Sequence, residues 1–287
     1  MATARARDPA GLRALDLAIH FFDAHAAEYE SWAGGVHRRV ARRLVELAAP
    51  AAAEACLDVG CGTGLVSNAL GAAVGRRGQV VAIDVSAAML ARARRRARAN
   101  TVYQKLSATP ELWFRDGTFD LVVFGDSLPY LGDPMTSLME ARRVLRPGGR
   151  VAIAVHRRSL DTLAQDVFFG LLDDLQDRHA FALPRPQDQR SLLGEPAVLE
   201  GLLREAGFTP PRVTTSMTGG RVGSAEAWVE MMAKAGPRPF VLLSSLGPAA
   251  RRRVVAAVAE AMDRLGEEGL HYHSAYTFAV AVAGEAG

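Results

Sequence analysis

The stretch Leu57-Asp58-Val59-Gly60-Cys61-Gly62-Thr63-Gly64 is the strongest indication of the fold of this 287-residue chain. Its apolar start is typical of a buried strand, and its three glycines permit a sharp turn from that strand into a helix. Glycines also let backbone N–H groups approach a bound ligand without hindrance from Cβ atoms. Asp84 ends the next predicted strand, twenty residues after Gly64, where a carboxylate can accept hydrogen bonds from both hydroxyls of a ribose. The stretch and Asp84 together predict a site for a nucleoside-bearing cofactor.

The glycine spacing argues against a dinucleotide. The fingerprint Gly-x-Gly-x-x-Gly needs glycine at position 65, where this chain has Leu65. NAD therefore fits badly. NADP and polyphosphates fit worse, because Asp84 suits an unphosphorylated ribose.

Short β-rich runs alternate with helical stretches on either side of this loop. We predict strands at 55–59, 79–83, 120–124 and 150–155, with helices in most of the intervals between them. Two helices between residues 12 and 48, broken near Ala33-Gly34-Gly35, precede the first strand. Alternation of this kind predicts an α/β fold with a parallel, doubly wound sheet and right-handed crossovers.

The alternation loosens after His156. Helices are predicted at 160–177, 196–206, 225–235 and 248–265, a Pro-rich polar connection at 184–196, and two final strands of the same sheet at 211–217 and 275–283. We expect residues 1–50 to form an N-terminal helical lid segment. Residues 51–287 would form the main domain, with helical insertions at about 157–210 and 218–270. Such segments are candidates for a lid over the carboxyl edge of the sheet, where ligands bind in open α/β folds.

The composition is that of a globular protein, with 49% hydrophobic and 23% charged residues. No window approaches 18 uninterrupted apolar residues, and residues 1–13 contain four charges, so we expect no membrane partner and a cytoplasmic location. Cys56 and Cys61 are too few for a disulfide framework or a cysteine-based zinc site. The net charge of +3 favours no class of partner.

Four ordered stretches resemble the class I S-adenosylmethionine (SAM)-dependent methyltransferases, a broad group that includes quinone-biosynthesis and small-molecule methyltransferases. The first motif of that group matches residues 58–64, and its second-strand signature matches Ile83-Asp84-Val85-Ser86 with Met89-Leu90. Residues 119–123 resemble its fourth strand, and residues 143–150 the stretch that leads into the fifth. The resemblance covers about residues 25–155. It implies an enzyme with a Rossmann-like, mostly parallel seven-stranded sheet, SAM as cofactor and S-adenosylhomocysteine (SAH) as product.

The resemblance also implies a set of cofactor-binding residues. Asp84 would bind the ribose, and Val85 would flank the adenine. Ser107 stands where the family usually has an acid that holds the adenine amino group, and a hydroxyl carries no charge, so we expect a weaker contact there. The whole expected set is Tyr29, Asp58, Gly60, Cys61, Gly62, Gly64, Asp84, Val85, Met89, Ser107, Ala108, Phe124, Gly125 and Tyr130.

The stretch after the fourth strand, residues 124–130, lacks the Asn/Asp-Pro-Pro-Tyr tetrad of adenine-N6 and glutamine-amide methyltransferases. Methylation of nucleic-acid amino groups is therefore disfavoured. The arginine run at 92–98 has no interleaved aromatic residues, so we interpret it as a solvated helix face rather than a phosphate-binding strip.

Methyl transfer from a sulfonium is an in-line displacement, so a hydroxyl acceptor also needs a base that removes its proton. His156, directly after the fifth strand, and His25, on the first helix, are our first candidates for this base; His271 and His273 are further ones. An amine or enolate-like carbon would need no base. No metal is predicted, because Asp126 and Asp161 do not supply a cluster of carboxylates. Five aromatic residues would line an apolar acceptor pocket or belong to the core: Trp32, Trp113, Trp228, Phe168 and Phe169.

The leading hypothesis is an enzyme that methylates O, N or C of a small, partly apolar, natural-product-like metabolite. One alternative is a SAM-binding protein that no longer transfers methyl groups and acts as a partner subunit or a cyclase. An RNA methyltransferase is a weaker alternative. The sequence does not predict the oligomeric state.

Overall fold

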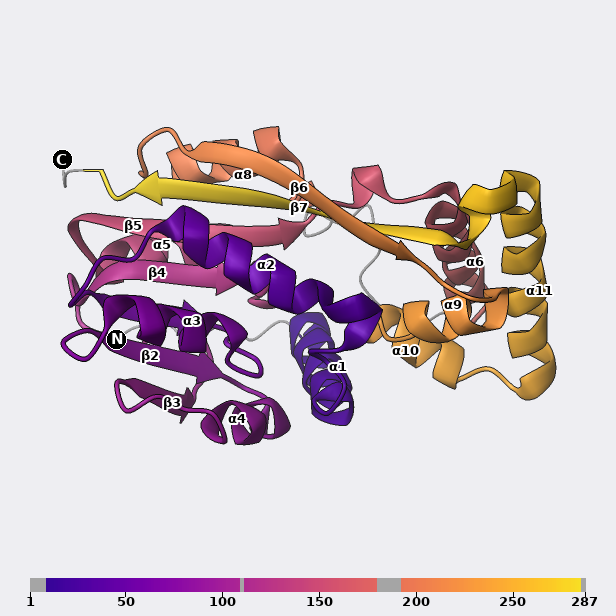
Figure 1. The fold of residues 1–287 in the computed structure, drawn as a ribbon, viewed down its shortest axis with the longest axis horizontal. Coiled ribbons are helices and arrows are strands. Elements are labelled where there is room, and N and C mark those ends of the chain that lie inside the picture. Colours follow the sequence, from indigo (N-terminus) through magenta and orange to yellow (C-terminus); the bar gives the residue numbers. More distant parts are fainter. Residues whose placement is uncertain (1–8, 109–110, 180–191, 285–287) are drawn as a thin grey trace.

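A seven-stranded sheet with the order β3-β2-β1-β4-β5-β7-β6 forms the centre of the protein (Figure 1). The computed structural model describes residues 9–108, 111–179 and 192–284. Neighbouring strands from β3 to β5 pair in parallel, whereas β7 runs antiparallel to both β5 and β6. The strands are β1 (Ala55–Val59), β2 (Gln79–Asp84), β3 (Thr101–Lys105), β4 (Phe119–Gly125), β5 (Leu145–His156), β6 (Arg212–Arg221) and β7 (His271–Val282). The predicted fold class, a doubly wound and mostly parallel seven-stranded sheet, is confirmed.

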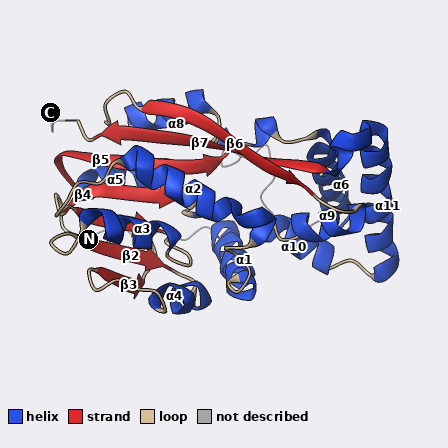
Figure 2. Ribbon diagram, in the orientation of Figure 1, coloured by secondary structure: helices blue, strands red, loops and turns tan. Residues whose placement is uncertain are grey.

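Helices cover both faces of this sheet, because successive strand residues point to opposite sides (Figure 2). In β4, Leu121 and Val123 pack with α2 (Trp32–Ala48) and α3 (Leu65–Val74). Val122, between them, packs on the other side with α5 (Pro134–Val144) and α8 (Pro196–Glu205). A smaller cluster joins α4 (Ala87–Arg94) to Ala82 of β2. β4 therefore lies buried at the centre, and its carboxyl end is held firmly.

The N-terminal helix α1 (Pro9–His25) lies beside the sheet at the carboxyl ends of the strands (Figure 1). Inside α2 the backbone of Ala33, Gly34 and Gly35 takes left-handed values, with φ of 45°, 64° and 79°. This kink falls where the sequence predicts a break. It redirects the chain so that α1 and the start of α2 lie close to the strand ends, while the rest of α2 packs on the sheet.

Four helices form a second hydrophobic cluster at one end of the molecule, on the right in Figure 1. They are α6 (Leu163–His179), α9 (Ala225–Met232), α10 (Pro237–Ser244) and α11 (Pro248–Leu265). β6 and β7 reach this helical cluster because they extend beyond β5, and residues 271–275 of β7 pair with β6 and not with β5. Three short 3₁₀ turns connect elements: η1 (Leu128–Tyr130), η2 (Arg158–Leu160) and η3 (Gly266–Leu270).

The expected insertion at about 157–210 divides into two parts. Its first helix, α6, belongs to the helical cluster, whereas Leu199 and Leu203 of α8 are fully buried against the main sheet. The helix α10 has no counterpart in the sequence prediction, because Pro237 and Pro239 argue against a helix there. Both prolines occupy the first turn of α10, where their missing N–H groups are not needed. The Pro-rich connection predicted at 184–196 falls mostly outside the described residues.

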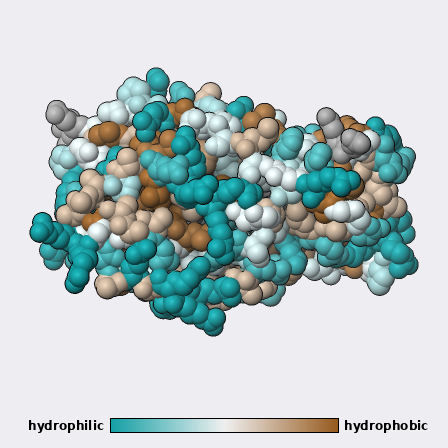
Figure 3. Space-filling view, viewed as in Figure 1, coloured by the Kyte–Doolittle hydropathy of each residue, from teal (hydrophilic) through white to brown (hydrophobic). Residues whose placement is uncertain are grey.

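Among the described residues, no helix is long and apolar enough to cross a membrane. On the face shown in Figure 3, hydrophilic residues gather over the lower edge at α4, where the arginine run begins. Several arginines of this run bind the protein itself: Arg94 donates to the Tyr103 carbonyl and Arg98 to the Asn68 carbonyl, both across 3.0–3.1 Å.

Candidate active site

Three cavities open at the carboxyl edge of the sheet, and Tyr29 and Asp126 line all three of them. The largest has a volume of about 330 Å³ and extends from β5 and β7 towards α1 and the helical cluster. The other two, of about 80 and 40 Å³, lie along the glycine loop. We call the largest the acceptor cavity and the two smaller ones together the cofactor cleft. Asp126 and Tyr29 lie where the acceptor cavity and the cofactor cleft meet.

Asp84 lies in the larger part of the cofactor cleft and organises the glycine loop. One carboxylate oxygen accepts from the Gly62 N–H and the other from the Ser86 N–H, each across 2.8 Å. Burial raises the pKa of the Asp84 carboxyl, and these backbone donors partly offset the effect. Each oxygen keeps a lone pair for a further donor. Around it, the cleft is lined by Leu15, Ala18, Ile19 and Phe22 of α1 and by Val85, Met89, Ser107 and Ala108.

Asp58 lies in the smaller part of the cofactor cleft. The Ser67 hydroxyl donates to its Oδ2 across 2.5 Å, while Oδ1 has no hydrogen-bond partner among the described residues. Burial raises the pKa of this carboxyl to about 7. A buried oxygen without a partner fits a ligand that brings a donor, such as the ammonium group of a methionine moiety.

Two glycines leave room for a ligand beside these carboxylates. At Gly62 φ is +54° and the side on which a Cβ would stand is open space. At Gly60 a Cβ would lie 2.4 Å from that of Ser127, so only glycine permits the close approach of β1 to the segment after β4. The residues present therefore fit SAM, with Asp84 placed for the ribose and Asp58 for the amino-acid end.

The N-terminal segment is fastened over the cofactor cleft by its own carboxylates. Asp23 of α1 accepts from the Ser86 hydroxyl across 2.5 Å and from the Ala88 N–H across 3.1 Å, at the start of α4. Glu30, which is 6% exposed, pairs with Arg96 and with Arg38. These contacts hold Tyr29 between the cleft and the acceptor cavity.

Asp126 is the most unusual residue of the site. It follows β4 with φ of +63°, a left-handed conformation that is uncommon for residues other than glycine and frequent at functional sites. Its Oδ1 accepts from the backbone N–H of His156 across 3.2 Å, and its Oδ2 accepts from the Tyr276 hydroxyl across 3.3 Å. Burial raises the pKa of the Asp126 carboxyl to about 7, and these two donors act against the rise. Burial and the Asp126 charge raise the pKa of the Tyr29 phenol, which therefore stays neutral.

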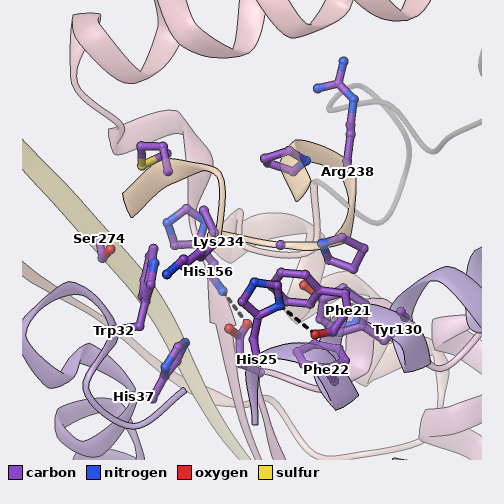
Figure 4. Close-up of a pocket in the computed structure, with 18 of the residues that line it drawn as sticks. Phe21, Phe22, His25, Trp32, His37, Tyr130, His156, Lys234, Arg238 and Ser274 are labelled. Carbon is purple, nitrogen blue, oxygen red and sulfur yellow. Dashed lines mark hydrogen bonds between the residues drawn. The ribbon is translucent and has the colours of Figure 1, made fainter. Parts of the chain in front are cut away.

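Aromatic side chains form much of the wall of the acceptor cavity (Figure 4). The rings of Tyr29 and His37 stack with centroids 3.9 Å apart, and the rings of Trp32 and His37 stack with centroids 5.4 Å apart. His37 Nδ1 lies 2.8 Å from the Tyr29 carbonyl, and burial lowers the pKa of the imidazole to about 4. His37 is thus a neutral, fixed ring. The wall suits a planar apolar molecule.

The two histidines predicted as bases both line the acceptor cavity. Burial lowers the pKa of His156 to about 4, and its Nε2 lies 3.6 Å from a carboxylate oxygen of Asp161. His25 is 9% exposed, its Nδ1 lies 2.9 Å from the Phe21 carbonyl, and its ring stacks on that of Phe21. Their place supports a contact with the acceptor, but neither lines the cofactor cleft.

The structure brings most of the predicted cofactor residues to one cleft, with two differences. Phe124 is 1% exposed and packs in the core under the cleft, because alternate residues of β4 face opposite sides. Gly64 does not line the cleft either; a Cβ there would lie 2.6 Å from the Tyr103 hydroxyl, so this glycine serves the packing of the loop on β3. The remaining twelve line the cavities: Tyr29, Asp58, Gly60, Cys61, Gly62, Asp84, Val85, Met89, Ser107, Ala108, Gly125 and Tyr130.

The five aromatic residues that the sequence offered for the acceptor pocket or the core also fall into separate groups. Trp32 and Phe169 line the acceptor cavity, Trp228 and Phe168 are fully buried in the helical cluster, and Trp113 is 73% exposed. The sequence interpretation missed Asp126 as an acid–base group, since it weighed this residue only as a metal ligand, and it missed His37 and Tyr276. An acid directly after a central strand was the available signal for Asp126. No group of three or more His, Cys, Asp or Glu side chains within the described ranges could hold a metal ion.

Comparison with known proteins agrees with this geometry. Residues 57–153 match a family model described as a methyltransferase domain. A 2-phytyl-1,4-naphtoquinone methyltransferase of Trichormus variabilis is 31% identical over 187 residues, which are 61% of this chain and 81% of that protein. The ubiquinone/menaquinone biosynthesis C-methyltransferase UbiE of Vibrio campbellii is 28% identical over 216 residues, 70% of this chain and 83% of that protein. The chain belongs to the class I SAM-dependent methyltransferases, and SAM is its cofactor.

Two further matches support fewer conclusions, because one covers a small part of both chains and the other has low sequence identity. An uncharacterized 37.1 kDa protein in transposon Tn4556 of Streptomyces fradiae is 41% identical over 101 residues, 35% of this chain and 29% of that protein. The crystal structure of YcgJ from Bacillus subtilis superimposes with a TM-score of 0.58 and 16% identity, covering 86% of this chain and 99% of that one. This likeness supports the fold.

Proposed function

We propose that the enzyme transfers the methyl group of SAM to a hydroxylated aromatic metabolite held in the acceptor cavity, with Asp126 as the general base. The observation that carries the proposal is the place of Asp126, which lines both the cofactor cleft and the acceptor cavity. The reacting groups have to meet at such a junction, because the displacement is in line.

Asp126 suits this role better than His156. A base works best when its pKa lies near the working pH, and the pKa of Asp126 is raised to about 7 whereas that of His156 is lowered to about 4. In the proposed reaction a bond forms between the methyl carbon and the acceptor atom while the methyl–sulfur bond breaks. SAH leaves, and the acceptor proton passes to the Asp126 carboxylate. The Tyr276 hydroxyl and the His156 N–H hold that carboxylate in place.

Two observations support an aromatic ring as the acceptor, methylated on carbon or oxygen. The stacked rings of Tyr29, His37 and Trp32 form one wall of the cavity. Relatives are named as ubiquinone/menaquinone C-methyltransferases and as a naphtoquinone methyltransferase. A hydroxyl on such a ring makes the ring carbon nucleophilic once its proton is removed. After methylation at carbon, the protonated Asp126 would return its proton to the ring oxygen and take the proton of the methylated carbon, which restores the aromatic ring. One base therefore serves either target.

We further propose that α1 and the helical cluster determine which methyl acceptor the enzyme binds. The acceptor cavity is lined by Leu15, Phe21 and Phe22 of α1, by Phe169 of α6 and by residues 232–239 between α9 and α10. These segments surround the cavity but contribute little to the cofactor cleft apart from α1. Natural variation in the helical cluster would change the substrate and leave SAM binding intact.

The test is a pH profile of methyl transfer to 1,4-dihydroxynaphthalene by the wild type and by Asp126→Asn. A carboxylate acts as a base only when deprotonated, so kcat/KM of the wild type is expected to rise with pH and level off above about 7. In Asp126→Asn this limb should disappear and kcat should fall by roughly 10²–10⁴-fold. SAH affinity, measured by calorimetry, should stay near that of the wild type. An Asn variant with the wild-type rate and profile would remove Asp126 from the reaction.

A further inference from the structure

Arg158 of η2 is a cation that lines the acceptor cavity without a hydrogen-bond acceptor among the described residues. Its nearest carboxylate oxygen, Oδ2 of Asp161, lies 3.8 Å from Nε, which is too far for a hydrogen bond. The side chain is 26% exposed. Burial lowers the pKa of the guanidinium. A guanidinium has five N–H donors, so this one is far from satisfied by the protein.

The other long cationic side chains of the same cavity are already paired. Lys234 donates to a carboxylate oxygen of Glu28 across 2.8 Å. Arg238 forms an ion pair with Asp173, its Nε donates to Gln176 across 2.8 Å, and Figure 4 shows its side chain directed away from the cavity. Arg158 therefore differs from Lys234 and Arg238, because its nearest carboxylate is too far away to accept a hydrogen bond.

The guanidinium of Arg158 also lies over an aromatic ring. Its Cζ lies 3.8 Å from the centroid of the Phe169 ring, a cation–π contact. Gln165, one turn before Phe169 on α6, ties this helix to β7: its Nε2 donates to the His273 carbonyl, and its Oε1 accepts from the His273 N–H, both across 3.0 Å. A guanidinium stacked on a ring keeps the N–H groups at its edge available for a planar anion.

We propose that Arg158 binds a carboxylate of the acceptor, so that the substrate is a hydroxylated aromatic acid. The inference rests on the proposed function and specifies its substrate class. The carboxylate would accept from the guanidinium edge while the ring lies against the aromatic wall towards Asp126. Charge decides between carboxylate and phosphate. A phosphate dianion would need a second cation within reach, and Lys234 and Arg238 of the same cavity are already bound to carboxylates.

Binding of 6-hydroxy-2-naphthoate and of its uncharged carboxamide to the SAH-loaded enzyme tests this inference. The wild type should bind the naphthoate at least about tenfold more tightly than the carboxamide, which corresponds to about 1.4 kcal/mol. Arg158→Gln should remove this preference by weakening the naphthoate alone. Arg158→Lys, which keeps the charge without the planar fork, should retain part of it. Arg157→Gln is the matched control, since it removes the neighbouring arginine, which pairs with Glu195 and does not line the acceptor cavity, and it should keep the full preference.

Each outcome separates this inference from the proposed function. Equal affinities in the wild type, no binding of either probe at millimolar concentration, or an unchanged preference in Arg158→Gln would overturn it. SAH affinity in each variant reports folding, because Arg157 and Arg158 do not line the cofactor cleft. If 1,4-dihydroxynaphthalene is methylated while the naphthoate shows no preference, only the carboxylate is wrong. If the preference holds and no acceptor is methylated, the proposed function fails instead.

Discussion

The cofactor cleft and the acceptor cavity meet at Asp126 but are built in different ways. The floor of the cleft comes from short continuous stretches at the ends of β1, β2 and β4, held by backbone hydrogen bonds such as those from Gly60 and Cys61 to the Ile83 carbonyl. The wall of the acceptor cavity comes from α1, α2, the end of β5, α6 and β7, which are far apart in the sequence. Its contacts are mostly between side chains, as in the stack of Tyr29 and His37.

This difference indicates which parts of the sequence tolerate substitution. Backbone geometry and buried carboxylates specify the cofactor cleft, so a small change there is expected to have a large effect. Aromatic surfaces and single polar groups specify the acceptor cavity, so its residues can change one at a time and alter the substrate.

Gly60→Ala should have the largest effect. The new Cβ would lie 2.4 Å from that of Ser127, and φ of +70° is costly for alanine by about 1–2 kcal/mol. Displacement of the loop adds to this strain, so SAH affinity should fall on the order of 100-fold or more. Gly148→Ala is the control, because φ is +76° there and its Cβ would meet nothing within 4 Å. If calorimetry shows that Gly60→Ala binds SAH no worse than Gly148→Ala does, the close approach of β1 to Ser127 does not shape the site.

Asp84→Ala should weaken SAM binding by roughly tenfold to several hundredfold. Charge-assisted bonds to ribose hydroxyls contribute roughly 1.5–3 kcal/mol each, and 1.4 kcal/mol is a factor of ten. The variant also loses the acceptors of the Gly62 and Ser86 N–H groups, which are turned inwards to this carboxylate. Asp84→Asn should fall between the wild type and alanine. Wild-type affinity in a folded Asp84→Ala, checked by circular dichroism, would place the ribose elsewhere.

His156→Gln should lower kcat by less than about tenfold, against the roughly 10²–10⁴-fold expected of a lost general base. The hydrogen bond that Asp126 receives from residue 156 comes from the backbone, so it survives the substitution. The measurement is kcat with 1,4-dihydroxynaphthalene beside Asp126→Asn. A loss as large as that of Asp126→Asn would make His156 the base and would restore the interpretation made from the sequence.

Asp23→Ala should have the smallest effect, about a three- to tenfold loss of SAM affinity, because helix caps contribute about 1 kcal/mol. It removes the contacts of α1 with the Ser86 hydroxyl and the Ala88 N–H, while the apolar residues of α1 still cover the cleft. Asp16→Ala removes an exposed carboxylate from the same helix and serves as the control. Equal affinities in the two variants would show that α1 is held by its apolar contacts alone.

The sequence predicts the sheet and the cofactor cleft well because local signals specify both. Gly60, Gly62 and Asp84 belong to one strand–turn–helix unit and its neighbour, and their spacing is visible along the chain. Arg158, Phe169 and Tyr276 meet only through the packing of η2, α6 and β7, so no short pattern marks them. The prediction of Phe124 as a cofactor contact shows the limit of motifs, since a shift of one residue along a strand turns a side chain from the site to the core.

A crystal structure of the SAH complex would show whether cofactor and acceptor meet at Asp126. We predict that the ribose hydroxyls bind Asp84, that the amino group lies at Asp58, and that the sulfur contacts Tyr29 and faces the acceptor cavity beside Asp126. A sulfur separated from that cavity by protein, with Asp126 out of reach of any group bound there, would show that methyl transfer does not take place at Asp126.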